Sequence, residues 1–136
     1  MAKIVWREKL SVGVEAIDSD HRTLIEHINT LDSAIHAQVY DSRAVAITLL
    51  RLIEYTKKHF EREERIMVSV QYPGYIEHHR EHVKAVQAIG NLSKHFTEEP
   101  TKKNAEHIYQ FTTDWLVNHI IMSDTKITPY TKTVKF

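Results

Sequence analysis

Seven histidine and carboxylate side chains fall in four stretches of this chain that each have a helical pattern: His21, His59, Glu63, His78, His82, His119 and Asp124. His59 and Glu63 are four residues apart, and so are His78 and His82. Residues at that spacing point the same way from an α-helix, so each pair would offer two donors to one interior point. This arrangement predicts two metal ions held inside a helical bundle.

The donor types limit the metal. The chain has 10 histidines and no cysteine, so a transition-metal site must use imidazole and carboxylate, which suit iron, manganese, zinc, copper or nickel. The alternative for any single histidine is a solvated surface position, since histidine is commonly only partly buried. We assign that alternative to the five histidines without a suitably placed partner four residues away: His27, His36, His79, His95 and His107.

For the seven donors as a set, burial favours metal binding. They interrupt the apolar stripes of the expected helices rather than the polar faces, and each buried ionisable group costs several kcal/mol unless it is paired or binds a metal. His119 and Asp124 are five residues apart, which is about 140° around a regular helix. Asp124 can therefore reach the site only if the helix loosens at its end.

N-cap residues predict where the helices begin. The first helix is expected to start near Asp18 or Ser19, after an N-terminal arm of about sixteen residues. Asp41 and Ser42 are expected to cap the second helix.

Turn residues predict where the helices end. Residues 72–74, with the sequence Tyr-Pro-Gly, end the second helix, and the linker 97–101 ends the third. Pro129 is expected to end any helical structure after the fourth helix. Gly90 lies inside the third helix, where we interpret it as a site of close packing.

Four helices with short connections predict an all-α fold, an up-down-up-down four-helix bundle with an N-terminal arm and a short C-terminal tail. A chain of 136 residues is expected to form a single domain over residues 1–136.

The charge balance excludes several partners. Lys plus Arg and Asp plus Glu both number 18, so no excess charge predicts binding to nucleic acid or to an anionic membrane. The N-terminal sequence carries charges where a signal peptide is apolar, and no stretch approaches the ~20 apolar residues of a membrane span. Membrane insertion is therefore not expected. Because nothing in a cysteine-free chain indicates an oxidising compartment, we expect a cytoplasmic protein.

Short motifs surround the donors: Trp6, residues 12–18 before His21, residues 59–64, Tyr72-Pro73 before His78 and His82, and residues 115–120 before Asp124. In this order they resemble the bacterial hemerythrins, which are single-domain oxygen-binding di-iron proteins, over nearly the full length of the chain.

The resemblance implies two iron ions bridged by an oxo or hydroxo group. The implied ligands are three histidines on one iron (His78, His82, His119), two on the other (His21, His59) and two bridging carboxylates (Glu63, Asp124). With the bridging group, this gives the three-histidine iron a closed octahedral shell and leaves the two-histidine iron one open position. The implied function is reversible O₂ binding for storage, transport or delivery, without enzymatic activity.

Apolar residues one turn from the donors are candidates for an O₂ pocket: Leu24, Ile25, Ile66, Met67, Trp115 and Leu116. Most of them could equally be ordinary core residues, and both interpretations can hold, since a packed apolar lining admits O₂ but no organic substrate. By resemblance, Leu116 is the expected gate residue.

Two other functions stay open. A ferritin-like di-iron oxidase would use Glu-x-x-His pairs, but no glutamate lies three residues before any histidine here. An iron-buffering role is related to this alternative.

The other alternative function is an O₂-sensing module. Because the chain ends soon after Asp124, we expect a sensor to act through a separate partner. For an oxygen-delivery protein, the expected recipient is an oxygen-consuming enzyme.

Overall fold

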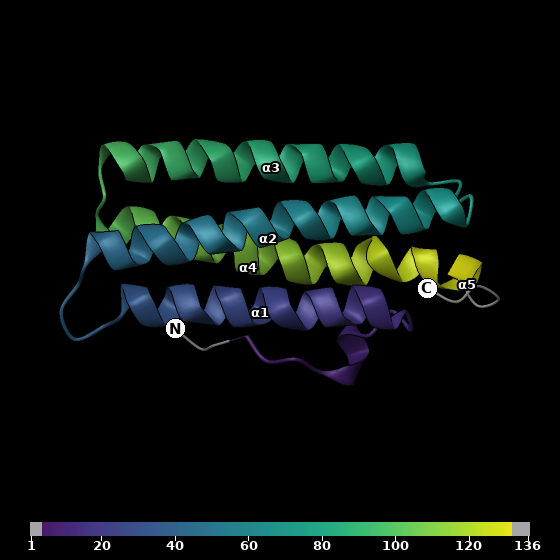
Figure 1. The fold of residues 1–136 in the computed structure, drawn as a ribbon, viewed down its shortest axis with the longest axis horizontal. Coiled ribbons are helices and arrows are strands. Elements are labelled where there is room, and N and C mark those ends of the chain that lie inside the picture. The colour runs from purple at the N-terminus through teal and green to yellow at the C-terminus, as the bar shows by residue number, and fades with distance from the viewer. Residues whose placement is uncertain (1–3, 132–136) are drawn as a thin grey trace.

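The computed structural model describes residues 4–131, which form helices and no strand (Figure 1). The four long helices are α1 (Glu15–Ile35), α2 (Ser42–Ser69), α3 (Tyr75–Glu98) and α4 (Lys102–Met122). Three short elements accompany them: the 3₁₀-helices η1 (Glu8–Leu10) and η2 (Asp124–Ile127), and α5 (Thr128–Thr131). Consecutive long helices run antiparallel, and α4 returns beside α1. The predicted all-α four-helix bundle is confirmed.

The first helix begins earlier than predicted. α1 starts at Glu15, and its N-cap residue makes no side-chain capping hydrogen bond. Asp18 lies inside the helix and instead accepts hydrogen bonds from the backbone N–H of Val12 (2.9 Å) and the hydroxyl of Ser11 (2.5 Å). The prediction of a start at Asp18 or Ser19 was therefore wrong, because the cap-forming side chain fastens the arm rather than the helix end.

Caps at two other helices follow ordinary capping chemistry. Asp41 accepts a hydrogen bond from the backbone N–H of Arg43 (3.0 Å) at the start of α2, as predicted. At the start of α4, Thr101 accepts one from the backbone N–H of Asn104 (3.2 Å). These bonds satisfy helix N–H groups that have no partner within the helix.

Two interpretations of single residues were wrong. A Cβ atom at Gly90 would meet no heavy atom within 4 Å, so this glycine does not mark close packing in α3. Pro129 does not end the helical structure, because it lies within α5. Proline is tolerated in the first turn of a helix, where its missing N–H would have no intrahelical partner.

The N-terminal arm is fastened to the bundle at two places. The side chain of Asn29 donates to the carbonyl of Ile4 (2.8 Å) and accepts from its backbone N–H (3.2 Å). Near the other end of the arm, the hydroxyl of Thr128 donates to the carbonyl of Val12 (2.5 Å). The arm is thus tied both to α1 and to the first residue of α5.

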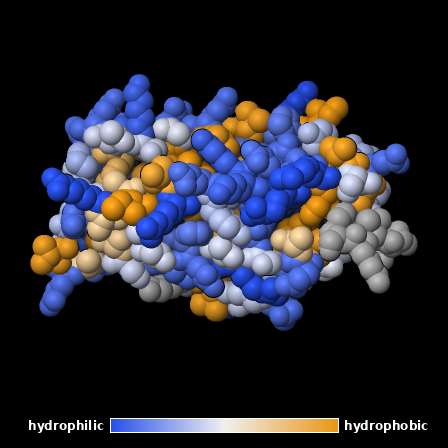
Figure 2. Space-filling model, viewed as in Figure 1, coloured by the Kyte–Doolittle hydropathy of each residue, from blue (hydrophilic) through white to orange (hydrophobic). Residues whose placement is uncertain are grey.

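The apolar stripes of the long helices meet in the interior. Ile28 and Leu31 of α1, Leu52 of α2, and Ile108 and Ile120 of α4 are each at most 1% exposed. Outside, polar side chains cover much of the face in Figure 2, with smaller apolar areas between them. None of the helices in residues 4–131 combines the length and apolar character needed to span a bilayer. The buried side chains named above thus give the bundle an apolar interior.

Candidate metal centre

The seven predicted donors meet inside the bundle. They come from all four long helices and from η2, and none is more than 6% exposed. Their potential ligating atoms form two groups, within each of which all atoms lie within 4.8 Å of one another: Glu63, His78, His82, His119 and Asp124 in one, and His21, His59, Glu63 and Asp124 in the other. We call them the three-histidine group and the two-histidine group.

Glu63 belongs to both groups because its two oxygens face different ways. Its Oε1 lies 2.7 Å from Nε2 of His78 and 3.1 Å from Nε2 of His82, in the three-histidine group. Its Oε2 lies 3.3 Å from Nε2 of His59 and 3.8 Å from Nε2 of His21, in the two-histidine group. A carboxylate that directs one oxygen to each group has the geometry of a bridging ligand.

Asp124 repeats this arrangement from the opposite side of the bundle. Its Oδ1 lies 3.0 Å from Nε2 of both His78 and His119, and its Oδ2 lies 3.0 Å from Nε2 of His21. The side chain reaches this position because α4 ends at Met122 and the chain continues as a 3₁₀-helix from Asp124. The predicted loosening of the helix end is confirmed.

Three further carboxylates hold histidine rings from behind. Each lies beside an Nδ1 atom: Asp20 beside His59 (2.9 Å), Glu64 beside His82 (2.9 Å) and Glu81 beside His119 (3.1 Å). A carboxylate in this position keeps the ring proton on Nδ1, so that the Nε2 lone pair faces the interior. These residues were not predicted from the sequence. The available signal was that all three directly adjoin donors: Asp20 is next to His21, Glu64 next to Glu63, and Glu81 next to His82.

Asp20 is itself held by two other side chains. It accepts a hydrogen bond from the hydroxyl of Tyr55 (2.6 Å) and two from the guanidinium of Arg62 (2.7 and 2.8 Å). Burial would raise the pKa of the Asp20 carboxyl, but hydrogen bonds from His59, Arg62 and Tyr55 keep it well below its ordinary value. Asp20 therefore remains a fixed negative charge behind His59.

The crowding of Nε2 atoms shows that the donor set fits cations. Nε2 of His119 lies 2.9 Å from Nε2 of His78 and 3.2 Å from Nε2 of His82. When the ring protons are on Nδ1, the lone pairs of these Nε2 atoms point toward one another and repel. A cation bound between them would remove this repulsion. Among the described residues, the buried atoms that lack a hydrogen bond of good geometry include Nε2 of His21, Oε2 of Glu63 and both carboxylate oxygens of Asp124.

The charges of the cluster are strongly coupled. Burial lowers the pKa of His59, but hydrogen bonds to neighbouring carboxylates raise it overall to about 9. Hydrogen bonds to Asp124 and Glu63 likewise outweigh burial and raise the pKa of His78 to about 9 and that of His119 to about 10. Despite their own burial, Glu63 and Asp124 have pKa values below the ordinary range, because histidines donate to them. In the metal-free protein, the two carboxylates are thus ionised and these three histidines protonated at neutral pH.

An apolar cavity lies about one helical turn from the histidines. Leu24, Thr56, Phe60, Trp115 and Leu116 are among the residues that line it, and we call it the inner cavity. Its volume available to water-sized molecules is about 20 Å³, which is enough for one small molecule.

Three of the predicted pocket residues, Leu24, Trp115 and Leu116, line the inner cavity. Ile25 and Ile66 are not among its lining residues, although both are buried, at 5% and 9% exposed. Within a helix, a side chain one turn from a ligand can still point to a neighbouring part of the core, and sequence spacing alone does not distinguish the two.

Two aromatic rings stack on histidines of the three-histidine group. Trp115 lies on His119, with ring centroids 4.3 Å apart and an interplanar angle of 14°. Phe60 lies on His82 at 3.9 Å and 4°. Together with the carboxylates behind them, these contacts fix the orientation of both imidazoles.

The five histidines expected on the surface lie there or at its edge. His36, His79, His95 and His107 are exposed, and His27 is half-buried. His79 nevertheless contacts the site indirectly, because its Nδ1 lies 2.5 Å from Oε1 of Glu64, whose other oxygen contacts His82.

Comparisons with known proteins agree with this geometry. Residues 12–131 match the hemerythrin HHE cation binding domain. The chain is 29% identical to the bacteriohemerythrin of Stenotrophomonas maltophilia, over 88% of this chain and 76% of that protein, and 31% identical to the myohemerythrin of Riftia pachyptila, over 85% and 83%. A crystal structure of wild-type hemerythrin superimposes with a TM-score of 0.83 at 30% identity, covering 94% of this chain and 97% of that one. The chain belongs to the hemerythrin family, whose members bind O₂ at a di-iron site.

Proposed function

We propose that the seven donors divide between the two irons as the two groups divide. In this assignment the three-histidine group would hold one iron and the two-histidine group the other, and Glu63 and Asp124 would each supply one carboxylate oxygen to either group. The single observation that carries the proposal is that each of these carboxylates directs one oxygen to each group.

A pair of iron ions supplies the two electrons that reversible O₂ binding requires. The protein supplies the asymmetry between the ions. Because the two-histidine group has one imidazole fewer, it would leave room for a small ligand, and we assign O₂ to this group. The carboxylate of Asp20 behind His59 holds one of the two remaining imidazoles in place.

The inner cavity supports binding rather than catalysis. About 20 Å³ accommodates a diatomic molecule but no organic substrate. Thr56 and Thr112 carry the hydroxyls on its lining, and these donate to backbone carbonyls of their own helices at 2.7 and 2.9 Å. They are therefore not free to act as acids toward a ligand.

Storage, transport or delivery of O₂ is the role we propose for the protein, with an oxygen-consuming enzyme as the recipient in the case of delivery and the cytoplasm as the location. The absence of cysteine from the sequence is the observation behind the proposed location.

The assignment can be tested by comparing a variant that lacks a predicted iron ligand with a variant that lacks a residue of the inner cavity. His59→Ala removes one of the two imidazoles of the two-histidine group, so it is expected to lower the iron content and abolish stable O₂ binding. Leu116→Ala leaves all seven donors intact and is expected to retain both irons while releasing O₂ faster. Truncation of a buried leucine costs about 2–5 kcal/mol, so both variants are compared with the unaltered protein at a temperature where all are folded. Loss of metal from Leu116→Ala with normal O₂ binding by His59→Ala would contradict the assignment.

A further inference from the structure

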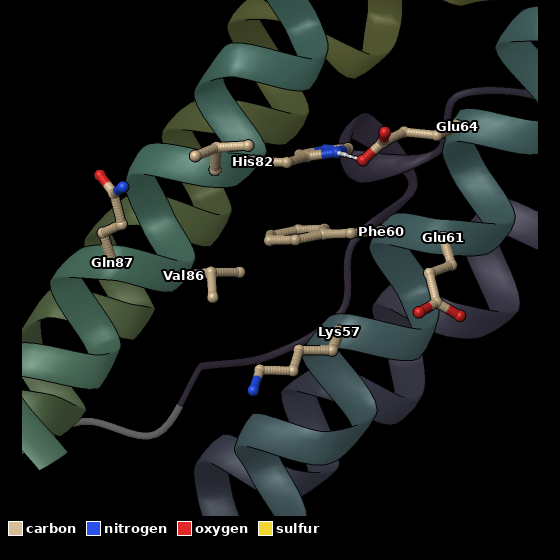
Figure 3. Close-up of a pocket in the computed structure, with 8 residues that line it drawn as sticks. Lys57, Phe60, Glu61, Glu64, His82, Val86 and Gln87 are labelled. Carbon is tan, nitrogen blue, oxygen red and sulfur yellow. Dashed lines mark hydrogen bonds and ion pairs between the residues drawn. The ribbon is translucent and has the colours of Figure 1, made fainter.

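Phe60 borders a second cavity besides the inner one. This outer pocket lies between α2 and α3, and its volume available to water-sized molecules is about 280 Å³. Lys57, His82, Val83 and Val86 are among its lining residues. Figure 3 shows the ring of Phe60 extending from α2 toward α3, with His82 and Val86 beside it. Glu61, Glu64 and Gln87 also line the outer pocket, but most of the surface that faces it is apolar.

Phe60 is the one residue that the outer pocket and the inner cavity share among their described lining residues. The residue is only 4% exposed, so it closes the inner cavity toward this side. Leu116, by contrast, lines the inner cavity and not the outer pocket. Displacement of one side chain, that of Phe60, would join the two spaces.

A different approach to the metal centre exists at the end of the bundle. A pocket of about 280 Å³ there is lined by polar residues that include His78, Glu81, Ser123 and Lys126. Both approaches border the three-histidine group, this pocket at His78 and the outer pocket at His82, so they differ mainly in polarity. O₂ is apolar, so its transfer from water into the apolar outer pocket beside Phe60 is more favourable than its transfer into a polar, hydrated pocket.

We propose that Phe60 is the gate through which O₂ passes between the outer pocket and the inner cavity. The inference rests on the proposed function, because it concerns access to the same centre. Stacking on His82 and contact with Trp115, at a centroid distance of 5.4 Å, define the closed position of the ring. The outer pocket provides the space into which the ring moves.

Two substitutions test the gate from opposite directions in the iron-loaded protein. Phe60→Leu shortens the gate and is expected to raise the rates of both O₂ binding and O₂ release about tenfold, which corresponds to a barrier lower by ~1.4 kcal/mol. Val86→Phe fills the outer pocket and is expected to lower both rates. In Val86→Phe, which leaves the stacking of Phe60 on His82 in place, the ratio of the rates, and thus the affinity, should stay close to that of the unaltered protein, because a gate changes the barrier and not the bound state. Val39→Phe, at a residue 81% exposed and not among the residues lining the outer pocket, is the matched control.

A second measurement needs no iron. Trp115 lines the inner cavity, and in a Trp6→Phe background it is the single tryptophan. In the iron-free full-length chain, quenching of its fluorescence by dissolved O₂ should become faster in Phe60→Leu and slower in Val86→Phe. Acrylamide is too large and polar for the inner cavity, so quenching by acrylamide should be the same in all variants. It measures the contribution of the solvent-exposed part of the Trp115 indole to quenching.

The possible results separate the gate from the proposed function. An unaltered iron-loaded protein that never binds O₂ would overturn the function, while the fluorescence measurement would still decide the route. If the protein binds O₂ but neither substitution changes the rates or the quenching, Phe60 is not the gate. A change in the release rate alone would also overturn the inference, because it would indicate that Phe60 contacts the bound ligand. Val86→Phe keeps the test valid if Phe60→Leu weakens the fold.

Discussion

At the scale of single residues, the carboxylates beside the histidine Nδ1 atoms determine the tautomer and the orientation of the imidazole rings. Asp20, Glu64 and Glu81 each lie beside an Nδ1 atom, which leaves Nε2 as the donor that faces the interior. Asp20 has the strongest support, since Tyr55 and Arg62 fix its carboxylate. The ring of His59 is therefore oriented by a network that extends to the surface of α2.

Asp20→Asn should weaken iron binding at the two-histidine group without changing the shape of the side chain. A neutral amide is a weaker acceptor than the carboxylate and no longer balances Arg62, so the tautomer and orientation of His59 become less fixed. We expect a loss of roughly 10- to 100-fold in iron affinity, measured by competition with a chelator. Asp114→Asn, at an exposed residue that contacts Gln110, is the control. If Asp20→Asn binds iron as tightly as Asp114→Asn does, Asp20 does not orient His59 for iron binding.

The sequence made the seven donors predictable but not the carboxylates that orient them. The donors interrupt apolar stripes, and two pairs have the spacing of a helix turn, so the signal is local. The contact between Asp20 and His59 spans 39 residues, and that between Glu64 and His82 spans 18. Such contacts depend on how neighbouring helices are rotated against each other, which the spacing within one helix does not determine.

At the scale of elements, the end of α4 departs from regular helix geometry so that Asp124 can reach the metal centre. A regular helix would turn Asp124 away from His119, and the chain avoids this by changing to a 3₁₀-helix. The need for this change could be predicted from the five-residue spacing. The start of α1 could not, because Asp18 was equally suited to cap a helix and to bind the arm, and only packing of the arm decides between them.

Gly90→Ala should stabilise the protein. Gly90 is exposed within α3, and an added Cβ would meet no atom within 4 Å, so the substitution removes backbone freedom from the unfolded chain at no steric cost. We expect a gain of about 0.5–1 kcal/mol in the free energy of unfolding, measured by chemical denaturation. Gly13→Ala is the informative comparison: Gly13 has φ +75°, so the same change should destabilise there. A loss of stability in Gly90→Ala would show that this glycine has a packing role after all.

At the scale of the whole molecule, the bundle encloses ionisable groups that need either protons or metal. In the iron-free protein, the raised pKa values of His59, His78 and His119 mean that these residues bind protons more tightly in the folded than in the unfolded state. Iron requires the same nitrogens in their unprotonated form. Protons and iron therefore compete for one cluster, and pH affects the two forms of the protein in opposite ways.

The iron-free protein should be most stable in mildly acidic solution. The histidines contribute stability in full below their ordinary pKa of 6.5 and lose it as the pH rises through about 9 to 10. Glu63 and Asp124, whose pKa values are lowered, contribute above their ordinary values of 4.5 and 3.8 and lose that contribution at lower pH. The melting temperature of the iron-free protein should thus fall between about pH 6 and pH 9, whereas the iron-loaded protein should retain its metal over this range and lose it on acidification. Parallel curves for the two forms would contradict this competition.

The central claim, that two irons in this bundle bind O₂ reversibly, is tested most directly by the visible spectrum of the iron-loaded protein with its metal content. After anaerobic reduction the protein should be nearly colourless, gain visible absorption when O₂ is admitted, and lose it again when O₂ is removed, with two irons per chain throughout. A single iron per chain, a protein that stays colourless in air as a zinc protein would, or a colour that removal of O₂ does not reverse would contradict the account.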